Sequence, residues 1–272
     1  MRIDSHVHTF PDRLALAVRA HLGANSNGAL LDGPLLADVA ASVQARGFDA
    51  AWALPYAHRP GVAQGVNEWS ALEVTRYPWL LAGATFHPGD ANLAELVGRA
   101  LRELGLRVVK LHCAVGQFSA ADPRLAPLWE TASALRVPIV IHAGHRSGGA
   151  TEEDEVDELI PVLSAHPDLP IVLAHSGYPA ISRTLELMSR FECLYADLTP
   201  VWLSPIPITG ASIRRFPGRF LFGSDAPNSP LLPQDAQNHI QALGLTEREE
   251  ENLLGGTAVA LAGLPTAIAD SI

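Results

Sequence analysis

Seven of the eleven histidines lie in, or just after, short apolar segments rich in β-branched residues. Imidazole is the commonest protein ligand for metal ions and a frequent acid–base group near neutral pH. Surface histidines would be scattered through helices and loops, so this grouping favours one shared metal site over seven separate hydrogen-bonding roles. The seven are His6, His8, His87, His112, His142, His145 and His175.

The first and last of the apolar segments carry the most informative residues. His6 and His8 are two positions apart, so on a strand both side chains project from the same face. Asp225 follows the segment FLFGS, and a carboxylate buried there needs a cation or a histidine beside it to offset its desolvation. Imidazoles with a carboxylate suit a borderline divalent ion, so we expect Zn²⁺, with Mn²⁺ or Fe²⁺ as alternatives.

These residues need a scaffold that brings distant segments together. The apolar segments recur at intervals of roughly 25–45 residues, the size of a βα unit, and helical patterns fill the gaps. Strands are predicted at 3–9, 50–55, 80–86, 107–113, 138–144, 170–177, 193–199 and 220–226. Eight strands alternating with helices predict an α/β fold, a single (β/α)8 TIM barrel over residues 1–272, with its site at the carboxyl ends of the strands. A doubly wound open sheet is the alternative, but the glycine-rich turn that such sheets use for dinucleotides is missing after the first strand.

Local patterns predict where several helices begin. Thr151 precedes the acidic stretch EEDEVDEL, and Pro161 should break that helix. Thr246 and Glu249 have the spacing of a capping box. Asp90 is predicted to cap the helix that follows it.

Composition excludes several classes of function. Lys and Arg total 19 against 29 for Asp and Glu, and a net charge of −10 argues against nucleic acid or an anionic membrane as partner. The two cysteines, Cys113 and Cys193, are too few for a disulfide framework. No apolar run approaches the ~20 residues that span a bilayer, and the first residues lack a signal-peptide core. We therefore expect a cytoplasmic enzyme with a small-molecule substrate, and a homodimer is left open.

Six segments spread over nearly the whole chain form a recognisable series: IDSHVH (3–8), VVKLH (108–112), DPRLAPLWETA (122–132), PIVIHAG (138–144), IVLAHSG (171–177) and FLFGSDAP (220–227). In these segments the chain resembles the amidohydrolase superfamily, specifically the amidohydrolase-2 branch that includes aminocarboxymuconate semialdehyde decarboxylase. The resemblance implies a metal-dependent TIM-barrel enzyme in which His6, His8, His142 and Asp225 bind the principal metal. It also implies that His175 either binds a metal or acts beside it as a catalytic imidazole.

The expected chemistry uses a metal-activated water at the barrel mouth. Asp225 would take its proton and deliver it to a leaving group, and His175 would polarise the substrate carbonyl. Our main prediction is a hydrolase acting on an amide, lactone or ester of a small organic molecule. The alternative is a non-oxidative decarboxylase of an unsaturated or aromatic carboxylic acid at the same site. A second alternative is a non-catalytic barrel that binds a metal or a small molecule.

Four residues are expected to contact the substrate: Lys110, His112, His145 and Arg146. His112 shares a strand face with Lys110 and lies nearer the mouth, and a guanidinium at Arg146 could hold a carboxylate with two hydrogen bonds. A bare ammonium at Lys110 would be costly to bury. The resemblance permits its reaction with CO₂ to a carbamate that bridges two metals, with His175 as a full ligand. We expect one metal, with Lys110 as a charged neighbour.

Overall fold

The computed structural model describes residues 1–25, 33–144, 146–147, 150–199, 207–229 and 233–263. In these segments eight parallel strands pair in chain order. They are β1 (Ile3–Val7), β2 (Ala50–Ala53), β3 (Leu80–Thr85), β4 (Val108–His112), β5 (Ile139–His142), β6 (Ile171–Leu173), β7 (Leu194–Asp197) and β8 (Phe220–Leu221). Each lies within its predicted range, so the strand predictions are confirmed.

Backbone hydrogen bonds between the two ends of the sheet close it into a barrel. Asp225 N donates to His6 O at 2.9 Å, and His8 N donates to Ala226 O at 2.7 Å, so the segment after β8 lies against β1. A doubly wound sheet has open edges and a reversal of strand order, and neither occurs here. The predicted (β/α)8 barrel is therefore confirmed.

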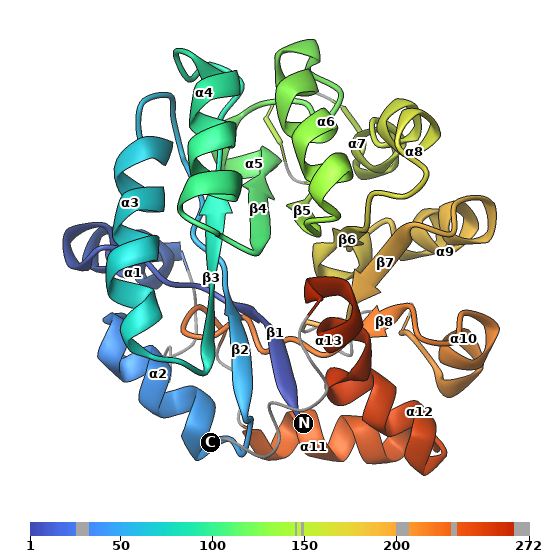
Figure 1. Cartoon of the computed structure of the whole chain (residues 1–272). Coiled ribbons are helices and arrows are strands. Elements are labelled where there is room, and N and C mark those ends of the chain that lie inside the picture. The colour runs from blue at the N-terminus through green and yellow to red at the C-terminus, as the bar shows by residue number, and fades with distance from the viewer. Residues whose placement is uncertain (26–32, 145, 148–149, 200–206, 230–232, 264–272) are drawn as a thin grey trace.

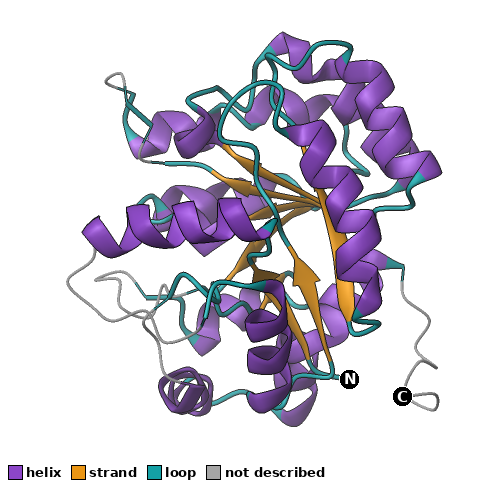
Figure 2. Cartoon of the chain, turned by 90° about the vertical axis from the view of Figure 1, so that its left-hand side faces the viewer, coloured by secondary structure: helices purple, strands orange, loops and turns teal. Residues whose placement is uncertain are grey.

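Helices surround the strands on the outside of the barrel (Figures 1 and 2), and the short α5 (Cys113–Gly116) follows β4 directly at the mouth. They are α1 (Asp12–Asn25), α2 (Leu36–Ala45), α3 (Ala63–Glu73), α4 (Leu93–Gly98), α5 (Cys113–Gly116), α6 (Ala126–Leu135), α7 (Glu152–Asp157), α8 (Ile160–Ala165), α9 (Ile181–Arg190), α10 (Gly210–Arg215), α11 (Pro233–Ala242), α12 (Glu247–Glu251) and α13 (Thr257–Ala262). A π-helical turn, Asn252–Gly256, joins α12 to α13. Within the residues that the structure describes, none of these helices combines the length and the apolar character that crossing a bilayer requires.

Most of the predicted helix starts are confirmed. Thr151 Oγ1 accepts from Asp154 N at 3.1 Å and begins α7, and a separate helix, α8, has Pro161 in its first turn. The Thr246 capping box begins α12. The prediction for Asp90 is wrong, because α4 begins only at Leu93. The Asp90 carboxylate accepts instead from the backbone N–H groups of two loops, at residues 61 and 87.

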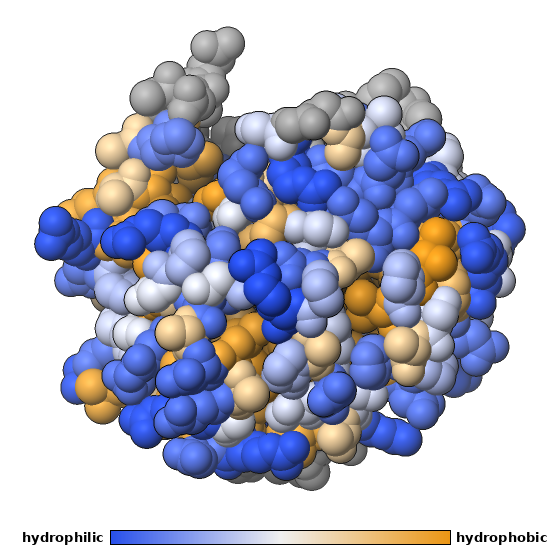
Figure 3. Space-filling model, turned by 90° about the horizontal axis from the view of Figure 1, so that it is seen from above, coloured by the Kyte–Doolittle hydropathy of each residue, from blue (hydrophilic) through white to orange (hydrophobic). Residues whose placement is uncertain are grey.

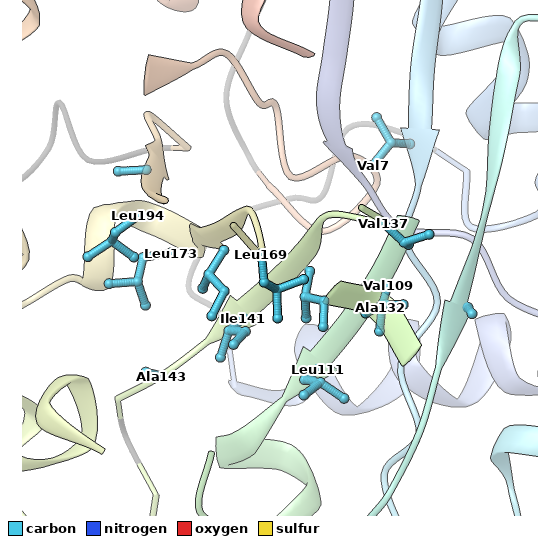
Figure 4. Packing of buried hydrophobic residues seen from close by; sticks show 14 of the residues in the cluster. Val7, Val109, Leu111, Ala132, Val137, Ile141, Ala143, Leu169, Leu173 and Leu194 are labelled. Atoms are coloured by element: carbon cyan, nitrogen blue, oxygen red, sulfur yellow. The ribbon is translucent and has the colours of Figure 1, made fainter. Parts of the chain in front are cut away.

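Strand residues alternate between the two sides of the barrel wall. On β4, Val108 packs in the interior cluster with Ile3 and Trp52, whereas Val109 and Leu111 pack outward against the helices. Figure 4 shows part of the outer layer, which includes Val109 and Leu111. Lys110 and the strand-end histidines occupy interior positions in this alternation, so their side chains point toward the barrel axis. The surface seen in Figure 3 is mostly hydrophilic, with apolar patches between polar side chains.

Candidate metal centre and active-site cavity

His6 is fully buried, and Asp197 fixes the direction of its ring. The Nδ1 atom of His6 lies 2.9 Å from Asp197 Oδ2, so Nδ1–H donates to the carboxylate and the lone pair is left on Nε2. This Nε2 lies 3.0 Å from Lys110 Nζ and 3.8 Å from Asp225 Oδ1. A carboxylate behind a histidine is the usual arrangement that orients a metal-binding imidazole.

Two more histidines are oriented in the same way by backbone carbonyls. The Nδ1 atom of His8 lies 2.8 Å from Leu54 O, and that of His175 lies 2.6 Å from Thr199 O. A carbonyl oxygen only accepts, so Nδ1 carries the hydrogen in both rings and Nε2 is free to bind a ligand. The His6 and His175 rings are 4.9 Å apart, and the His6 and His8 rings 5.0 Å, between centroids.

The contact between His8 and Asp225 provides a test of whether the residues fit a metal ion. His8 Nε2 and Asp225 Oδ1 are 3.1 Å apart, and both atoms bear lone pairs. A shared proton or a cation must therefore lie between them. Two ligands about 2 Å from one Zn²⁺ are themselves separated by roughly 3–3.5 Å, so the spacing fits a divalent ion. His6, His8 and Asp225 form one donor group with ligand atoms within 4.8 Å of one another, and His6, His175 and Asp197 form a second.

Charges in the site follow from burial and these contacts. Burial alone would raise the pKa of Asp197, but the charge and hydrogen bond of His6 outweigh it and lower the pKa to about 2. Burial opposes ionisation of Asp225 as well, yet the hydrogen bond with His8 and the charge of His175 hold its pKa below the usual range. Burial lowers the pKa of Lys110 to about 8. The site thus holds two carboxylates beside a buried amine.

His142 lies at the edge of this group and not within it. Its ring centroid is 4.8 Å from that of His175 and 4.0 Å from that of His112, on which it stacks. The register of the sheet pairs His112 with His142 directly, at the ends of β4 and β5. Burial lowers the pKa of both rings well below the usual value, so both are neutral near pH 7. The two donor groups among the described residues do not include His142.

A cavity of about 720 Å³ opens above these residues. One side is polar and the other is mainly aliphatic, the latter supplied by α1 and by the short α5. The aliphatic lining includes Leu14, Ala17, Val18, Leu22, Ala114 and Val115. The polar lining consists of His8, His21, Tyr56, His58, His112, Gln117, His142, His175, Asp225 and Asn228. The cavity could therefore hold a molecule with an apolar body and a polar group aimed at the metal donors.

Two of the four expected substrate contacts do not line the cavity. Arg146 forms a two-pronged ion pair with Glu158, with Nη1 2.8 Å from Oε2, and donates also to Phe118 O at 3.0 Å. Its guanidinium is thus already paired and is not among the residues that line the cavity. Lys110 is fully buried against His6 and does not line the cavity either. His112 lines it, and His145 lies outside the described residues.

His87 also has a different role from the one that its position suggests. Its Nε2 lies 3.0 Å from Gly116 O, and its Nδ1 accepts from Gly89 N at 3.0 Å. Nε2 therefore joins the loop after β3 to α5, and Nδ1 holds a turn within that loop. His87 is a hydrogen-bonding residue of the scaffold.

Two residues of the site were not predicted from the sequence. Asp197 ends β7, as LYAD, and this acid at a strand end was the available signal. Tyr56 follows β2 and lines the cavity, with its ring centroid 5.2 Å from that of His8 and 4.8 Å from that of His112. Burial and the charge of Asp225 raise the pKa of the Tyr56 phenol, which keeps its hydrogen.

A (β/α)8 barrel with histidine and aspartate donors at the carboxyl ends of its strands is the architecture of a metal-dependent barrel enzyme. The family model for amidohydrolases matches residues 3–264. The chain therefore belongs to the amidohydrolase family and is an enzyme, as the resemblance predicted. No match is found among curated proteins.

Solved structures match the chain over almost its full length. A dihydroxybenzoic acid decarboxylase from a Polaromonas species, with bound manganese and the inhibitor 2-nitroresorcinol, has a TM-score of 0.72 at 16% identity, covering 100% of this chain and 99% of that one. A 5-carboxyvanillate decarboxylase from Sphingomonas paucimobilis has a TM-score of 0.67 at 17% identity, with coverages of 97% and 99%. An uncharacterised TIM-barrel protein from Bordetella bronchiseptica has a TM-score of 0.73 at 18% identity, with coverages of 96% and 99%. These likenesses establish a shared fold.

Proposed function

We propose that this enzyme is a metal-dependent, non-oxidative decarboxylase of an aromatic or unsaturated carboxylic acid. This reverses the order of our sequence predictions, in which hydrolysis came first. The observation that carries the proposal is the cavity, which joins histidine and aspartate donors on one side to an aliphatic surface on the other. Support also comes from two of the similar structures, which are decarboxylases of aromatic acids by name.

The two sides of the cavity match the two parts of such a substrate. Leu14, Val18 and Leu22 project from α1 and offer an apolar surface to a ring. Burying about 100 Å² of ring surface there would contribute roughly 2.5 kcal/mol to binding. The carboxylate of the substrate would then lie toward His8 and Asp225, where a bound divalent ion would compensate its charge.

The proposed roles of the site residues follow from their contacts. We assign His6, His8 and Asp225 as metal ligands, with His175 and His142 beside them. A divalent ion held there would act as a Lewis acid toward the substrate oxygens. Its nitrogen-rich donor set suits Zn²⁺, and the similar Polaromonas decarboxylase holds manganese, so either ion is to be tested.

The protein's own part in the reaction is to position the acid and to supply a proton. The substrate carbon gains a proton, the bond from that carbon to the carboxyl carbon breaks, and the electron pair of that bond stays with the substrate as CO₂ leaves. Asp225 and His175 face the cavity and are the groups placed to hold and deliver this proton. Asp197 takes no part in the transfer and instead keeps His6 in its binding orientation.

The test is product analysis on protein loaded with Zn²⁺ or with Mn²⁺. CO₂ released from 2,6-dihydroxybenzoate, 5-carboxyvanillate or an unsaturated carboxylic acid, and abolished by a chelator, is the expected result. Acid release from lactones or amides without CO₂ would restore the hydrolase as the main function. Metal binding without turnover of any of these compounds would favour the non-catalytic barrel.

A further inference from the structure

Four histidines in or beside the cavity have a hydrogen-bond partner at Nδ1, and they fall into two groups according to which ring nitrogen carries the hydrogen. In His6, His8 and His175 the partner of Nδ1 is a carboxylate or a carbonyl oxygen, which can only accept. In His112 the partner of Nδ1 is the backbone N–H of Val115, at 3.4 Å, which can only donate. The hydrogen bonds therefore give His112 the opposite tautomer to that of the other three histidines.

This difference determines what His112 can do in the cavity. Because its Nδ1 accepts a hydrogen bond, it carries no proton, and the single ring hydrogen is on Nε2. A nitrogen that bears a hydrogen has no lone pair for a metal ion. His112 lines the cavity, so its Nε2–H is available there as a donor to a bound molecule.

Tyr56 supplies a second donor beside it. Its side chain is only 7% exposed and lines the cavity, and its ring lies 4.8 Å from that of His112 between centroids. No hydrogen bond to the Tyr56 hydroxyl is formed by the residues that the structure describes. The hydroxyl is therefore also available to a ligand.

We propose that His112 and Tyr56 form a donor pair that selects substrates with an acceptor oxygen close to the group held at the metal donors. Tyr56 adjoins His8, at 5.2 Å between centroids, and His112 stacks on His142, so the pair flanks the site from two sides. A hydroxyl, phenolate or carbonyl oxygen next to the substrate carboxylate would meet both donors. This deepens the proposed function, on which it rests for the position of the carboxylate.

The competing explanation is that His112 only caps α5, whose four residues follow it directly. Two substitutions separate these roles. In His112→Asn, the amide oxygen can replace Nδ1 as the acceptor for Val115 N–H, but the cavity donor is lost. In His112→Gln, the longer amide can place an N–H near the position of Nε2, but the cap is lost. Tyr56→Phe removes the second donor and keeps the ring.

The first experiment measures binding of benzoate and 2-hydroxybenzoate to the metal-loaded enzyme by calorimetry. We expect the enzyme to bind 2-hydroxybenzoate about tenfold more tightly, which corresponds to one or two net hydrogen bonds. His112→Asn and Tyr56→Phe should each reduce this preference by about 3-fold or more, and His112→Gln should retain most of it. Loss of the preference in His112→Gln together with its retention in His112→Asn would show a capping role and overturn the proposal.

The second experiment reads the tautomers directly by nitrogen NMR of protein labelled at its histidines. The His112 ring should show a protonated Nε2, assigned by the loss of its signals in His112→Asn. A protonated Nδ1 in His112 would overturn the proposal. Neither readout requires turnover, so the donor pair can be tested separately from the proposed reaction. If the enzyme prefers 2-hydroxybenzoate but releases CO₂ from none of the acids, the proposed decarboxylase function is refuted and the donor pair is supported.

Discussion

The substitution Asp197→Asn is expected to weaken metal binding by changing the tautomer of a neighbouring histidine. In the enzyme, one oxygen of Asp197 accepts from the backbone N–H groups of His175 and Thr199, at 2.9 and 3.2 Å. The other oxygen accepts from His6 Nδ1 at 2.9 Å. An asparagine can keep only one of these acceptors. Its carbonyl would retain the two backbone bonds, and its NH₂ group would face His6.

The consequence for His6 can be estimated from these contacts. An amide NH₂ donates, so His6 Nδ1 must become the acceptor and its hydrogen must move to Nε2, the atom that we assign to the metal. Loss of such a supporting carboxylate typically lowers metal affinity 10- to 100-fold, or about 1.4–2.7 kcal/mol. The pKa of Asp197 is lowered from 3.8 to about 2, so the folded protein favours the ionised carboxylate over the protonated one.

The sign of the pH dependence follows from the direction of that shift. A carboxylate whose pKa is lower in the folded protein stabilises the fold fully above the unfolded value of 3.8, and this contribution is lost as the pH falls toward 2. The metal-free variant should therefore be less stable than the metal-free enzyme by a similar amount at pH 7 and at pH 5. Denaturant unfolding at both values measures this difference, and competition with a chelator measures the metal affinity.

Asp157→Asn is the matched control. Asp157 is paired with Arg183 near the surface, at 2.6 Å, so the control removes a carboxylate with little expected cost, about 0–1 kcal/mol. If Asp197→Asn binds the metal with an affinity within about twofold of that of the unaltered enzyme, the argument that this carboxylate sets the His6 tautomer is refuted.

Four further outcomes are expected. Asp225→Asn should lower turnover by about a hundredfold or more, because an amide cannot hold the transferred proton, and near-normal rates of CO₂ release would remove this residue from catalysis. Burial lowers the pKa of His6 to about 3, so His6 alone should cost the metal-free protein about 1.4 kcal/mol of stability per pH unit as the pH falls below 6.5. The buried His112 and His142 add to this slope, and His6→Gln should reduce it by the contribution of His6 in denaturant unfolding. Burial raises the pKa of the Cys113 thiol to about 12, so iodoacetamide at pH 8 should label it only after unfolding, as mass spectrometry would reveal. One metal per chain is expected after loading with excess Zn²⁺ and bicarbonate, and two metals, falling to one or none in Lys110→Ala, would instead indicate a carbamate.

The fold was predictable because its signals are local. Each strand is a short apolar segment, and eight of them in chain order leave few arrangements other than a barrel. The strand-end histidines were recognisable for the same reason, since the barrel brings all such ends to one mouth. Their grouping needed no knowledge of side-chain contacts.

What could not be predicted depends on contacts between distant segments. Asp197 looks like any acid at a strand end, and its role exists only because β1 and β7 bring it against His6. Arg146 looked free in its loop, but the fold provides Glu158 as its partner. Asp90 has the sequence of a helix cap and is used instead to join two loops. In each case a charged group found a better partner in the folded chain than its neighbours in sequence suggest.

The closing seam of the barrel has a consequence for the order in which the enzyme matures. His6 and His8 lie at the start of the chain and Asp225 near its end, and these residues meet only where the segment after β8 pairs with β1. During synthesis the ribosome releases the histidine pair long before the aspartate, so the nascent barrel offers an arriving metal ion an incomplete set of ligands. The last strand must dock before the ion is fully coordinated. With the ligands proposed above, full coordination of an ion requires this docking, so we expect metal uptake to be completed only after the barrel has closed.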